Sequence, residues 1–234
     1  MAEQEMASTF DVLWSLERTG KRGRRPSLSR NALVRAAIEL ADTEGIAAVT
    51  MHRLAALVDS KAMSLYRYVP SKEVLLDLMW DEAMAAPPKL GSGRWRSKLN
   101  RWAVANFERL EQHPWLIELV GSVRSVGPRW TGWLDAGLAA MATLPLTASE
   151  KLAVLMLIDG HLRSAARLRF GVKSDPQWAA DFGRMLQRSA ADDAYPTLGA
   201  MVRRGEFDVP GMSMDEMFEF GLDRILDGIE AYGA

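Results

Sequence analysis

The residues best suited to contact another molecule lie in one segment of the chain, between Thr50 and Lys72. Within it, the stretch from Ala62 to Tyr68 mixes small, hydroxyl, aromatic and basic side chains. Such side chains fit against base edges and hydrogen-bond to phosphate oxygens, whereas a helix buried in a core carries fewer polar groups. Contact with a nucleic acid is therefore the first chemistry to consider.

Two short helices joined by a tight turn are predicted to position these side chains. Thr50 can cap the first helix, because its hydroxyl can accept a hydrogen bond from the free N–H groups at a helix start. The apolar residues that follow keep a helical period: Leu54, Leu57 and Val58. Asp59 and Ser60 break that period, and the second helix follows. This is the layout of a helix-turn-helix DNA reader, although an ordinary helical hairpin fits the pattern alone equally well.

Further helices are expected on both sides of this segment. Ser29 caps a helix whose apolar residues recur every three or four positions, and Gly45 is placed to end it. Ser71 caps the helix that follows the segment, and Pro87 and Pro88 stop it. The chain is thus divided into an N-terminal extension with a basic arm (1–27), a helix-turn-helix domain (28–72) and a helical domain (73–234).

The distribution of charge separates the head from the remainder. The chain has a formal net charge of −1, yet from Arg18 to Lys72 it holds eleven basic residues against four acidic ones. The basic residues are Arg18, Lys21, Arg22, Arg24, Arg25, Arg30, Arg35, Arg53, Lys61, Arg67 and Lys72; the acidic ones are Glu39, Asp42, Glu44 and Asp59. Such asymmetry is typical of a nucleic-acid-binding head on another kind of body. A solvated basic face is the alternative.

The remainder of the chain is predicted to be helical throughout. Helical periods extend over 94–111, 128–144, 147–170, 176–191 and 213–232, with no alternating β pattern and no fixed repeat. The expected fold class is therefore all-α, with a three-helix head on a larger helical domain. The helices at 147–170 and 213–232 carry wide apolar stripes. These stripes fit core packing and an interface with a partner subunit equally well.

Composition argues against several kinds of site. With no cysteine, the chain cannot form a disulfide, a zinc ribbon or a thiolate nucleophile. Its three histidines, His52, His113 and His161, stand in no metal-binding or catalytic pattern, and no phosphate loop occurs. We expect no catalytic residue, metal or cofactor. No apolar run is long enough for a bilayer and the N-terminus lacks a secretory signal, so we expect a cytoplasmic location and no membrane partner.

Four stretches of the chain match the pattern of a known family. In the head they are LSRNALVRAAIELADTEGIAAVTMHRLA and SLYRYVPSKEVLLDLM, the latter with Tyr66, Val69 and Lys72 at characteristic spacing. In the body they are EQHPWLIEL and MFEFGLDRILDGIEAY. The head resembles the TetR family of one-component transcriptional repressors, and the body resembles the C-terminal domain of its tetracycline-repressor subgroup. The similarity covers nearly the whole chain and is weaker between about Gly121 and Gly211.

The resemblance implies that the head binds double-stranded operator DNA. By this resemblance Tyr66 and Lys72 clamp phosphates, and Thr50 supports backbone contacts. The chemistry agrees, since a phenol and an ammonium can each reach a phosphate oxygen. Arg67 can read guanine, and Met63 or Ala62 can touch a thymine methyl group. The DNA-binding residues predicted in the head are Thr50, His52, Lys61, Ala62, Met63, Ser64, Tyr66, Arg67, Tyr68 and Lys72.

The turn departs from the family pattern at two positions. Asp59 stands where the family usually has glycine, and Ser60 stands where it usually has an apolar residue. Aspartate tolerates a left-handed backbone better than most residues do, but less well than glycine. The geometry of the turn is therefore a point for the structure to test.

The basic linker before the head suggests a second set of DNA contacts. The stretch RGRRP resembles the core of an AT-hook, an extended arginine arm that lies in a narrow minor groove. We assign Arg22, Arg24 and Arg25 to DNA binding on this basis, because such arms precede the first helix in homeodomain-like readers. A disordered, solubilising tail is the alternative.

The body has the composition of a ligand-binding domain. Six of the eight tryptophans lie between Trp95 and Trp178, and aromatic and Met side chains commonly line apolar pockets. Simple filling of the core is the alternative. By the resemblance, the candidate pocket residues lie on helices that enclose the ligand in such repressors, with Asp159 as a polar anchor: Trp102, Trp115, Met156, Asp159 and Trp178.

The sequence thus predicts a homodimeric repressor on a palindromic operator. An apolar or aromatic small molecule, bound in a C-terminal ligand-binding and dimerisation domain, would release it. Two alternatives stay open. One is a helical small-molecule-binding protein or enzyme with an incidental basic head. The other is a DNA-binding regulator with no small-molecule effector.

Overall fold

The fold of this chain is helical wherever it is described. The computed structural model describes residues 9–15, 29–119, 125–171, 176–208 and 211–232. Within these ranges it contains helices and turns and no strand, which confirms the predicted all-α class. The basic arm with Arg22, Arg24 and Arg25 lies outside the described residues. None of the helices in these ranges combines the length and the apolar character needed to cross a membrane.

The head is formed by four short helices and one 3-10 turn, which are α1 (Thr9–Ser15), α2 (Arg30–Glu44), η2 (Ile46–Ala48), α3 (Met51–Leu57) and α4 (Ala62–Leu65). The N-caps predicted from the sequence are confirmed. The hydroxyl groups of Ser29 and Thr50 accept hydrogen bonds from backbone N–H groups three residues on, at 3.2 Å in both cases. Gly45 ends α2 with a φ of 84°, a conformation that favours glycine.

The second helix of the pair is shorter than expected. The sequence predicts a helix to Tyr68, but α4 ends at Leu65 and the chain continues as a turn. The N–H groups of Tyr68 and Val69 both donate to the Leu65 carbonyl, at 2.8 and 3.0 Å. Val69 precedes Pro70, whose ring disfavours helical backbone in the residue before it. The proline therefore disfavours a helix that continues through Val69.

The turn between α3 and α4 adopts the left-handed conformation that the family usually gives to glycine. Asp59 has a φ of 48°. The N–H of Ser60 donates to the Ala55 carbonyl at 2.9 Å, and the N–H of Asp59 points to the Ala56 carbonyl at 3.4 Å. This pair of bonds is a Schellman motif, in which the left-handed residue follows the helix end. The two departures from the family pattern thus leave the helix-turn-helix geometry intact.

The body contains eight helices in the described ranges. They are α5 (Lys72–Met84), α6 (Trp95–Gln112), α7 (Trp115–Glu118), α8 (Pro128–Ala140), α9 (Ala148–Ala166), α10 (Pro176–Ala191), α11 (Pro196–Arg203) and α12 (Met214–Tyr232). A π-helical turn, η3 (Arg167–Gly171), ends α9. The sequence did not predict the short helices α7 and α11. Ser71 caps α5 as predicted, because its hydroxyl accepts from the Val74 N–H at 3.2 Å.

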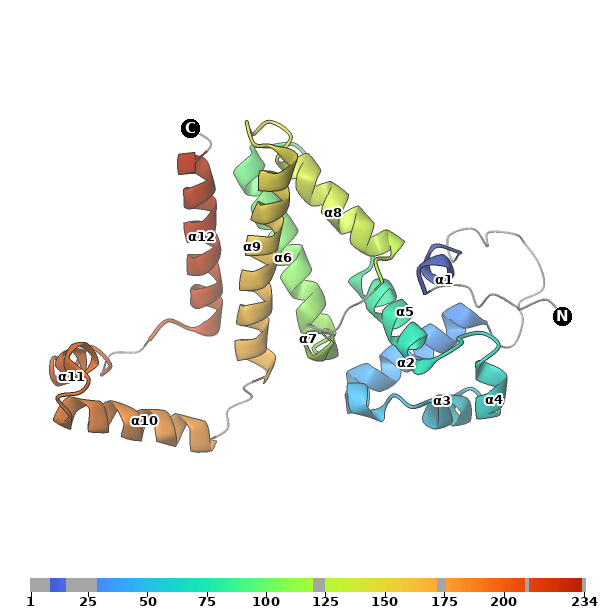
Figure 1. The fold of residues 1–234 in the computed structure, drawn as a ribbon, viewed down its shortest axis with the longest axis horizontal. Helices are drawn as coiled ribbons and strands as arrows, with labels where there is room; N and C mark the ends of the chain where they lie inside the picture. Colours follow the sequence, from blue (N-terminus) through green and yellow to red (C-terminus); the bar gives the residue numbers. More distant parts are fainter. Residues whose placement is uncertain (1–8, 16–28, 120–124, 172–175, 209–210, 233–234) are drawn as a thin grey trace.

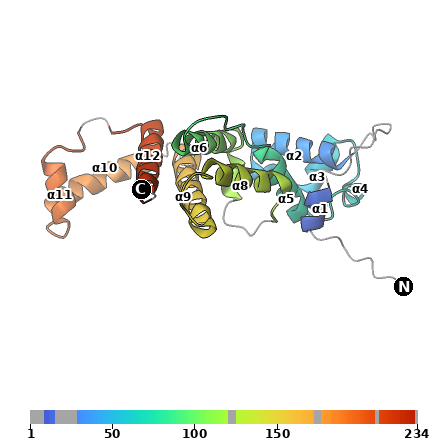
Figure 2. The same cartoon turned by 90° about the horizontal axis from the view of Figure 1, so that it is seen from above.

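These helices form an elongated molecule (Figures 1 and 2). α5 packs against α1 and α2 in the head and against α6 and α8 in the body, so it belongs to both. α6, α9 and α12 then stand side by side. α10 and α11 pack on each other and project from the body beyond α12 (Figures 1 and 2). One continuous cluster of buried apolar side chains runs from α1 to α12.

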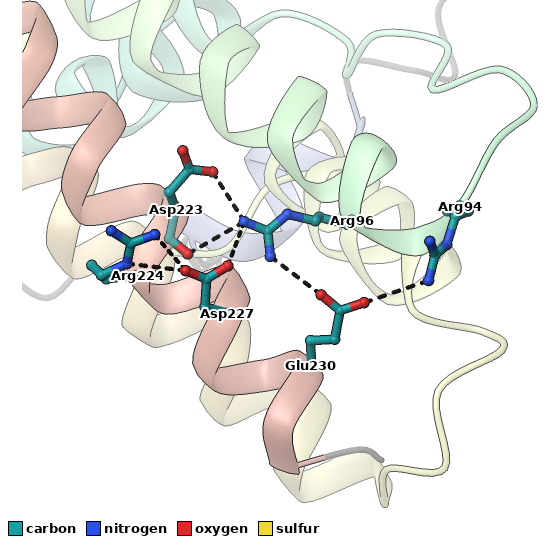
Figure 3. Close-up of polar contacts among 6 residues, drawn as sticks. All are labelled: Arg94, Arg96, Asp223, Arg224, Asp227 and Glu230. Atoms are coloured by element: carbon teal, nitrogen blue, oxygen red, sulfur yellow. Dashed lines mark hydrogen bonds and ion pairs between the residues drawn. The ribbon is translucent and has the colours of Figure 1, made fainter.

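An arginine on α6 joins the start of that helix to α12 (Figure 3). The Arg96 guanidinium lies 2.7 Å from a carboxylate oxygen of Asp227, 3.1 Å from Asp223 and 3.7 Å from Glu230. The pKa of Asp227 is lowered, chiefly by its hydrogen bond from Arg224 and also by that from Arg96. One cation thus holds three carboxylates that are spaced along the same face of α12.

The contact between α9 and α12 is closer than ordinary side chains permit. A Cβ added to Gly221 would lie 2.2 Å from the ring of His161. The His161 Nε2 is 2.9 Å from the Phe218 carbonyl, so this histidine ties the two helices together. At the other end, Glu150 accepts from the Tyr232 hydroxyl and caps α9, and these bonds lower its pKa to about 2. The last helix is therefore fixed to α9 at two separate points.

The Asp59 turn can be tested by substitution. In Asp59→Gly the strain of a left-handed non-glycine residue disappears, and we expect the free energy of unfolding to rise by about 0.5–1 kcal/mol. Asp59→Ala should lower it by a similar amount, because alanine is less tolerant of this conformation. Urea unfolding followed by circular dichroism measures both changes. An alanine variant as stable as the glycine variant would contradict a left-handed turn.

Candidate DNA-binding face and ligand pocket

The predicted DNA-contacting residues lie together on the surface of the head. Leu65 and Val69 are fully buried and fix α4 and the turn after it to the core. The side chain of Met63 is 80% exposed and that of Tyr66 is 41% exposed. The other predicted contacts in the head are exposed or half-buried: Thr50, His52, Lys61, Ala62, Ser64, Arg67, Tyr68 and Lys72. This surface combines polar, basic and apolar side chains that are accessible from outside the chain.

Two residues of this face are ordered by their own contacts. The guanidinium of Arg67 lies 5.2 Å from the ring centre of Tyr68 and donates to the Tyr68 hydroxyl at 3.2 Å. A cation over an aromatic face is attracted by the ring's electrons, so the pair limits the motion of a long side chain. The Arg67 side chain is thus held against Tyr68 on the exposed surface of the head.

Two other basic residues of the head bind to groups of the protein itself. Arg53 forms a two-pronged ion pair with Glu44, at 2.7 Å for each bond, and lowers the pKa of that carboxyl group. Arg30 donates to the Tyr68 carbonyl at 3.0 Å and to the Ser15 hydroxyl at 3.1 Å. It thereby connects α1, the start of α2 and the segment after α4. The basic excess of the head therefore serves both its architecture and its surface.

A pocket of about 370 Å³ lies in the body beside the head. Its walls come from α5, α6, α7, α8 and α9, and apolar side chains dominate them. Four of the lining residues are tryptophans, and three others are polar or charged. The lining consists of Trp80, Met84, Trp102, Asn106, Leu110, Leu116, Trp130, Trp133, Leu134, Leu152, Leu155, Met156, Asp159 and Arg163. A concave, mostly apolar site with a few polar groups is typical of small-molecule binding.

Three of the five pocket residues predicted from the sequence line this pocket: Trp102, Met156 and Asp159. The prediction was wrong for Trp115, which does not line it. Trp115 is buried against the head, where its indole N–H donates to the Asp42 carboxylate at 2.6 Å, and its neighbour Leu116 lines the pocket instead. The side chain of Trp178 lies outside the described residues.

Several lining residues were not found from the sequence. On α6 a signal existed, since Trp102, Asn106 and Leu110 are four residues apart and share one face of the helix. On α9 the same spacing joins Asp159 to Arg163, whose Nε lies 2.6 Å from the carboxylate. On α8, Trp130 and Trp133 are three residues apart and share a face as well. Only the packing of α5 against α8, which the sequence does not show, brings Trp80 to the same cavity.

Two sets of polar contacts connect the pocket walls to the head. Asp42, near the end of α2, accepts from Trp115 and lies 2.8 Å from the Nδ1 of His113. Both partners flank the junction of α6 and α7. Because Leu116 is next to Trp115, a residue of the pocket wall is covalently adjacent to a contact with the head.

The second set centres on Asp81 of α5. Its carboxylate accepts from the backbone N–H groups of Arg129 and Trp130 at 3.2 and 3.3 Å, and so caps α8. Burial raises the pKa of Asp81, although the Trp130 N–H and the charge of Arg129 oppose the shift. A Cβ at Gly127 would lie 2.2 Å from this carboxylate, so only glycine fits beside it.

Comparisons with known proteins agree with this arrangement. The family model described as "Bacterial regulatory proteins, tetR family" matches residues 33–79, and that described as "Tetracyclin repressor-like, C-terminal domain" matches residues 87–232. The HTH-type transcriptional repressor DrrR1 of Streptomyces coeruleorubidus is 34% identical over 238 residues, which cover 97% of this chain and 86% of that protein.

Solved structures share the fold. ActR of Streptomyces coelicolor, in complex with actinorhodin, has a TM-score of 0.74 at 21% identity, covering 90% of this chain and 100% of that one. A TetR variant from Acinetobacter baumannii in complex with minocycline has a TM-score of 0.63 at 19% identity, covering 88% and 99%. With a helix-turn-helix head joined to a helical, pocket-containing body, and with both family models matched in order along the sequence, the chain belongs to the TetR family of transcriptional regulators.

Proposed function

We propose that this protein is a transcriptional repressor that binds operator DNA as a homodimer and leaves it when a small molecule occupies the pocket. The observation that carries this proposal is the sharing of elements: α5 and α7 line the pocket and also contact the head. Three relatives support it. DrrR1 is named a repressor, ActR is seen with actinorhodin, and the TetR variant is seen with minocycline.

Operator binding would use the exposed face of α4 and the turn after it. Met63 and Arg67 would reach base edges in the major groove, whereas Tyr66 and Lys72 would bind phosphates and fix the register. A two-fold symmetric dimer matches a palindrome when its recognition helices stand about 34–36 Å apart, one turn of DNA.

The second copy would cover apolar surface on α9 and α12. Leu157 and Phe220 are 55% and 52% exposed. A groove of about 530 Å³ runs between the two helices, lined among others by Val154, Ile225 and Ile229. Interfaces of permanent dimers resemble a core cut in half, and this surface has that character. The projecting α10, with Phe182 40% exposed, would extend the same contact along the partner.

Release would follow from a shift between two arrangements of the head. A ligand acts only if it binds the two arrangements with different affinity. Here the ligand would touch Trp80 and Met84 on α5 and Leu116 on α7, and these helices hold α2 in place. A small change at those walls would alter the orientation of both heads, and their spacing would no longer fit the operator.

A gel-shift experiment tests the proposal directly. Labelled DNA from upstream of the protein's own gene should be retarded at about 100 mM salt, where phosphate contacts still hold. A ligand found by thermal-shift screening, with actinorhodin and minocycline among the first compounds, should abolish the retardation. Unretarded DNA would instead favour a ligand-binding protein with an incidental basic head. Stable retardation with every stabilising ligand would favour a regulator without an effector.

The phosphate role of Lys72 predicts a specific change in salt dependence. Lys72→Ala should weaken binding across all DNA sequences and reduce the slope of log affinity against log salt by about 1. Lys89→Ala, which removes an exposed lysine from the loop after α5, is the matched control and should change neither quantity. Fluorescence anisotropy at several salt concentrations measures both variants. An unchanged slope for Lys72→Ala would remove this residue from the DNA-binding face.

The contact of Trp115 with Asp42 predicts a variant that binds but does not respond. Trp115→Phe keeps a large buried ring and removes the indole N–H donated to the head. We expect operator affinity and ligand affinity to stay within about threefold, while the ligand concentration needed for release rises by about tenfold, a coupling change of about 1.4 kcal/mol. Ligand titration of the preformed DNA complex measures this, and an unaltered release curve would place the coupling elsewhere.

A further inference from the structure

We infer that the pocket takes a flat, uncharged, polycyclic aromatic ligand, and that the side-chain amide of Asn106 holds a carbonyl or hydroxyl group of that ligand. The inference deepens the proposed function, since it assigns a chemical class to the effector. It follows from the tryptophan walls, from one amide in the lining that has no hydrogen-bond partner among the described residues, and from the balance of charge in the lining.

The tryptophan walls are fixed in place and present ring carbons to the ligand. The rings of Trp102 and Trp133 meet edge to face, with centres 6.0 Å apart and planes at 71°. The Trp102 N–H donates to the Trp133 carbonyl at 2.9 Å, and the Trp133 N–H lies 3.1 Å from the Met84 carbonyl. Because both indole N–H groups are occupied, these rings offer a ligand only their apolar faces and edges.

α8 packs closely on the helices that carry two of the lining residues. A Cβ at Gly137 on α8 would lie 2.6 Å from Leu155 and 3.3 Å from the ring of Trp102. The Trp102 and Trp133 rings are thus held by helix packing as well as by their hydrogen bonds. A cavity lined by such aromatic rings favours a planar ring system, which stacks on them, over a flexible ligand.

Asn106 is the polar group that such a ligand would engage. It lies one turn after Trp102 on α6, its side chain lines the pocket, and the residue is only 7% exposed. In the described part of the chain, its amide has no hydrogen-bond partner. The Asn106 amide atoms are not sealed inside the protein, so their free donor and acceptor sites can be reached from the pocket. An amide both donates and accepts, so its natural complement is a neutral carbonyl or phenolic hydroxyl.

The charges of the lining favour a neutral ligand. Asp159 and Arg163 are the charged residues of this lining, and the Arg163 Nε lies 2.6 Å from the Asp159 carboxylate, so the lining has no net charge. A carboxylate on the ligand would share Arg163 with Asp159, and an ammonium would share Asp159 with Arg163, so neither would gain a counterion of its own after losing its hydration. A neutral ligand loses no such hydration, and the Asn106 amide can hydrogen-bond to it.

Tryptophan fluorescence provides a direct test without DNA. The probes are 1,8-dihydroxyanthraquinone and 5-hydroxyflavone, which are flat and neutral, against anthraquinone-2-sulfonate and dodecanoate, which carry a charge or a flexible chain. We expect the neutral aromatic probes to quench the fluorescence and to bind about tenfold or more tightly than the other two. Equal or tighter binding of the sulfonate or of dodecanoate, or no binding of either flat neutral probe, would overturn the inference.

Substitution at Asn106 separates the amide from the apolar walls. Asn106→Leu keeps the number and branching of side-chain heavy atoms, removes the amide and should weaken both neutral probes by about tenfold. Asn106→Ser is the second variant, which keeps a polar group of shorter reach and should weaken binding as well. Asn100→Leu, on the same helix outside this pocket, is the control and should bind as the unmodified protein does.

The outcomes remain distinct from those of the proposed function. Undiminished binding by both Asn106 variants would show that the amide does not hold the ligand, whatever the gel shift finds. Conversely, binding of the flat neutral probes through Asn106 with no operator retardation would leave the ligand class standing and would overturn the repressor proposal.

Discussion

The way in which Asp81 binds α8 determines how the head meets the body. This carboxylate is almost entirely removed from solvent and accepts two backbone N–H groups from the first turn of α8. A buried charge is costly unless it is paired and hydrogen-bonded, and the Arg129 side chain lies 3.4 Å away. Because only glycine fits at position 127 beside this carboxylate, the position of α8 on α5 is narrowly defined. α5 packs on the head and α8 lines the pocket, so this junction sets the placement of both.

The head and the pocket are also packed together as one unit through α5. α5 buries Val74, Leu75 and Leu78 against the helices of the head, and one turn later it presents Trp80 and Met84 to the pocket. The predicted boundary between the domains at 28–72 and 73–234 therefore falls at the start of α5, a helix that both parts share. The single apolar core that runs through both parts has the same implication.

Sequence reasoning succeeded where structure is set by neighbouring residues. The predicted caps at Ser29, Thr50 and Ser71 depend on local hydrogen bonds, and the structure has each of them. The sequence left the geometry of the turn at Asp59 open, and the structure shows it to be left-handed. The short helices α7 and α11 escaped prediction, because four and eight residues are too few to establish a helical period.

The pocket was less predictable, since its lining depends on the rotation of each helix about its axis. Trp115 and Leu116 are adjacent in sequence, yet one faces the head and the other faces the cavity. The spacing of Asn106 from Trp102 and Leu110 places it on one face of α6, but the sequence does not show that this face borders a cavity. Only its burial between helices that are distant along the chain makes its amide exceptional.

Within the pocket, the residues that would provide ligand affinity differ from those that would transmit ligand binding to the head. Trp102 and Trp133 are locked to backbone carbonyls, so this wall can contribute binding energy but has little freedom to move. Trp80, Met84 and Leu116 belong to helices that also contact the head, so under the proposed mechanism a ligand would distinguish two head positions through these walls. A ligand confined to the locked wall would bind without response. A ligand large enough to reach α5 and α7 as well would convert its binding into a movement of the head.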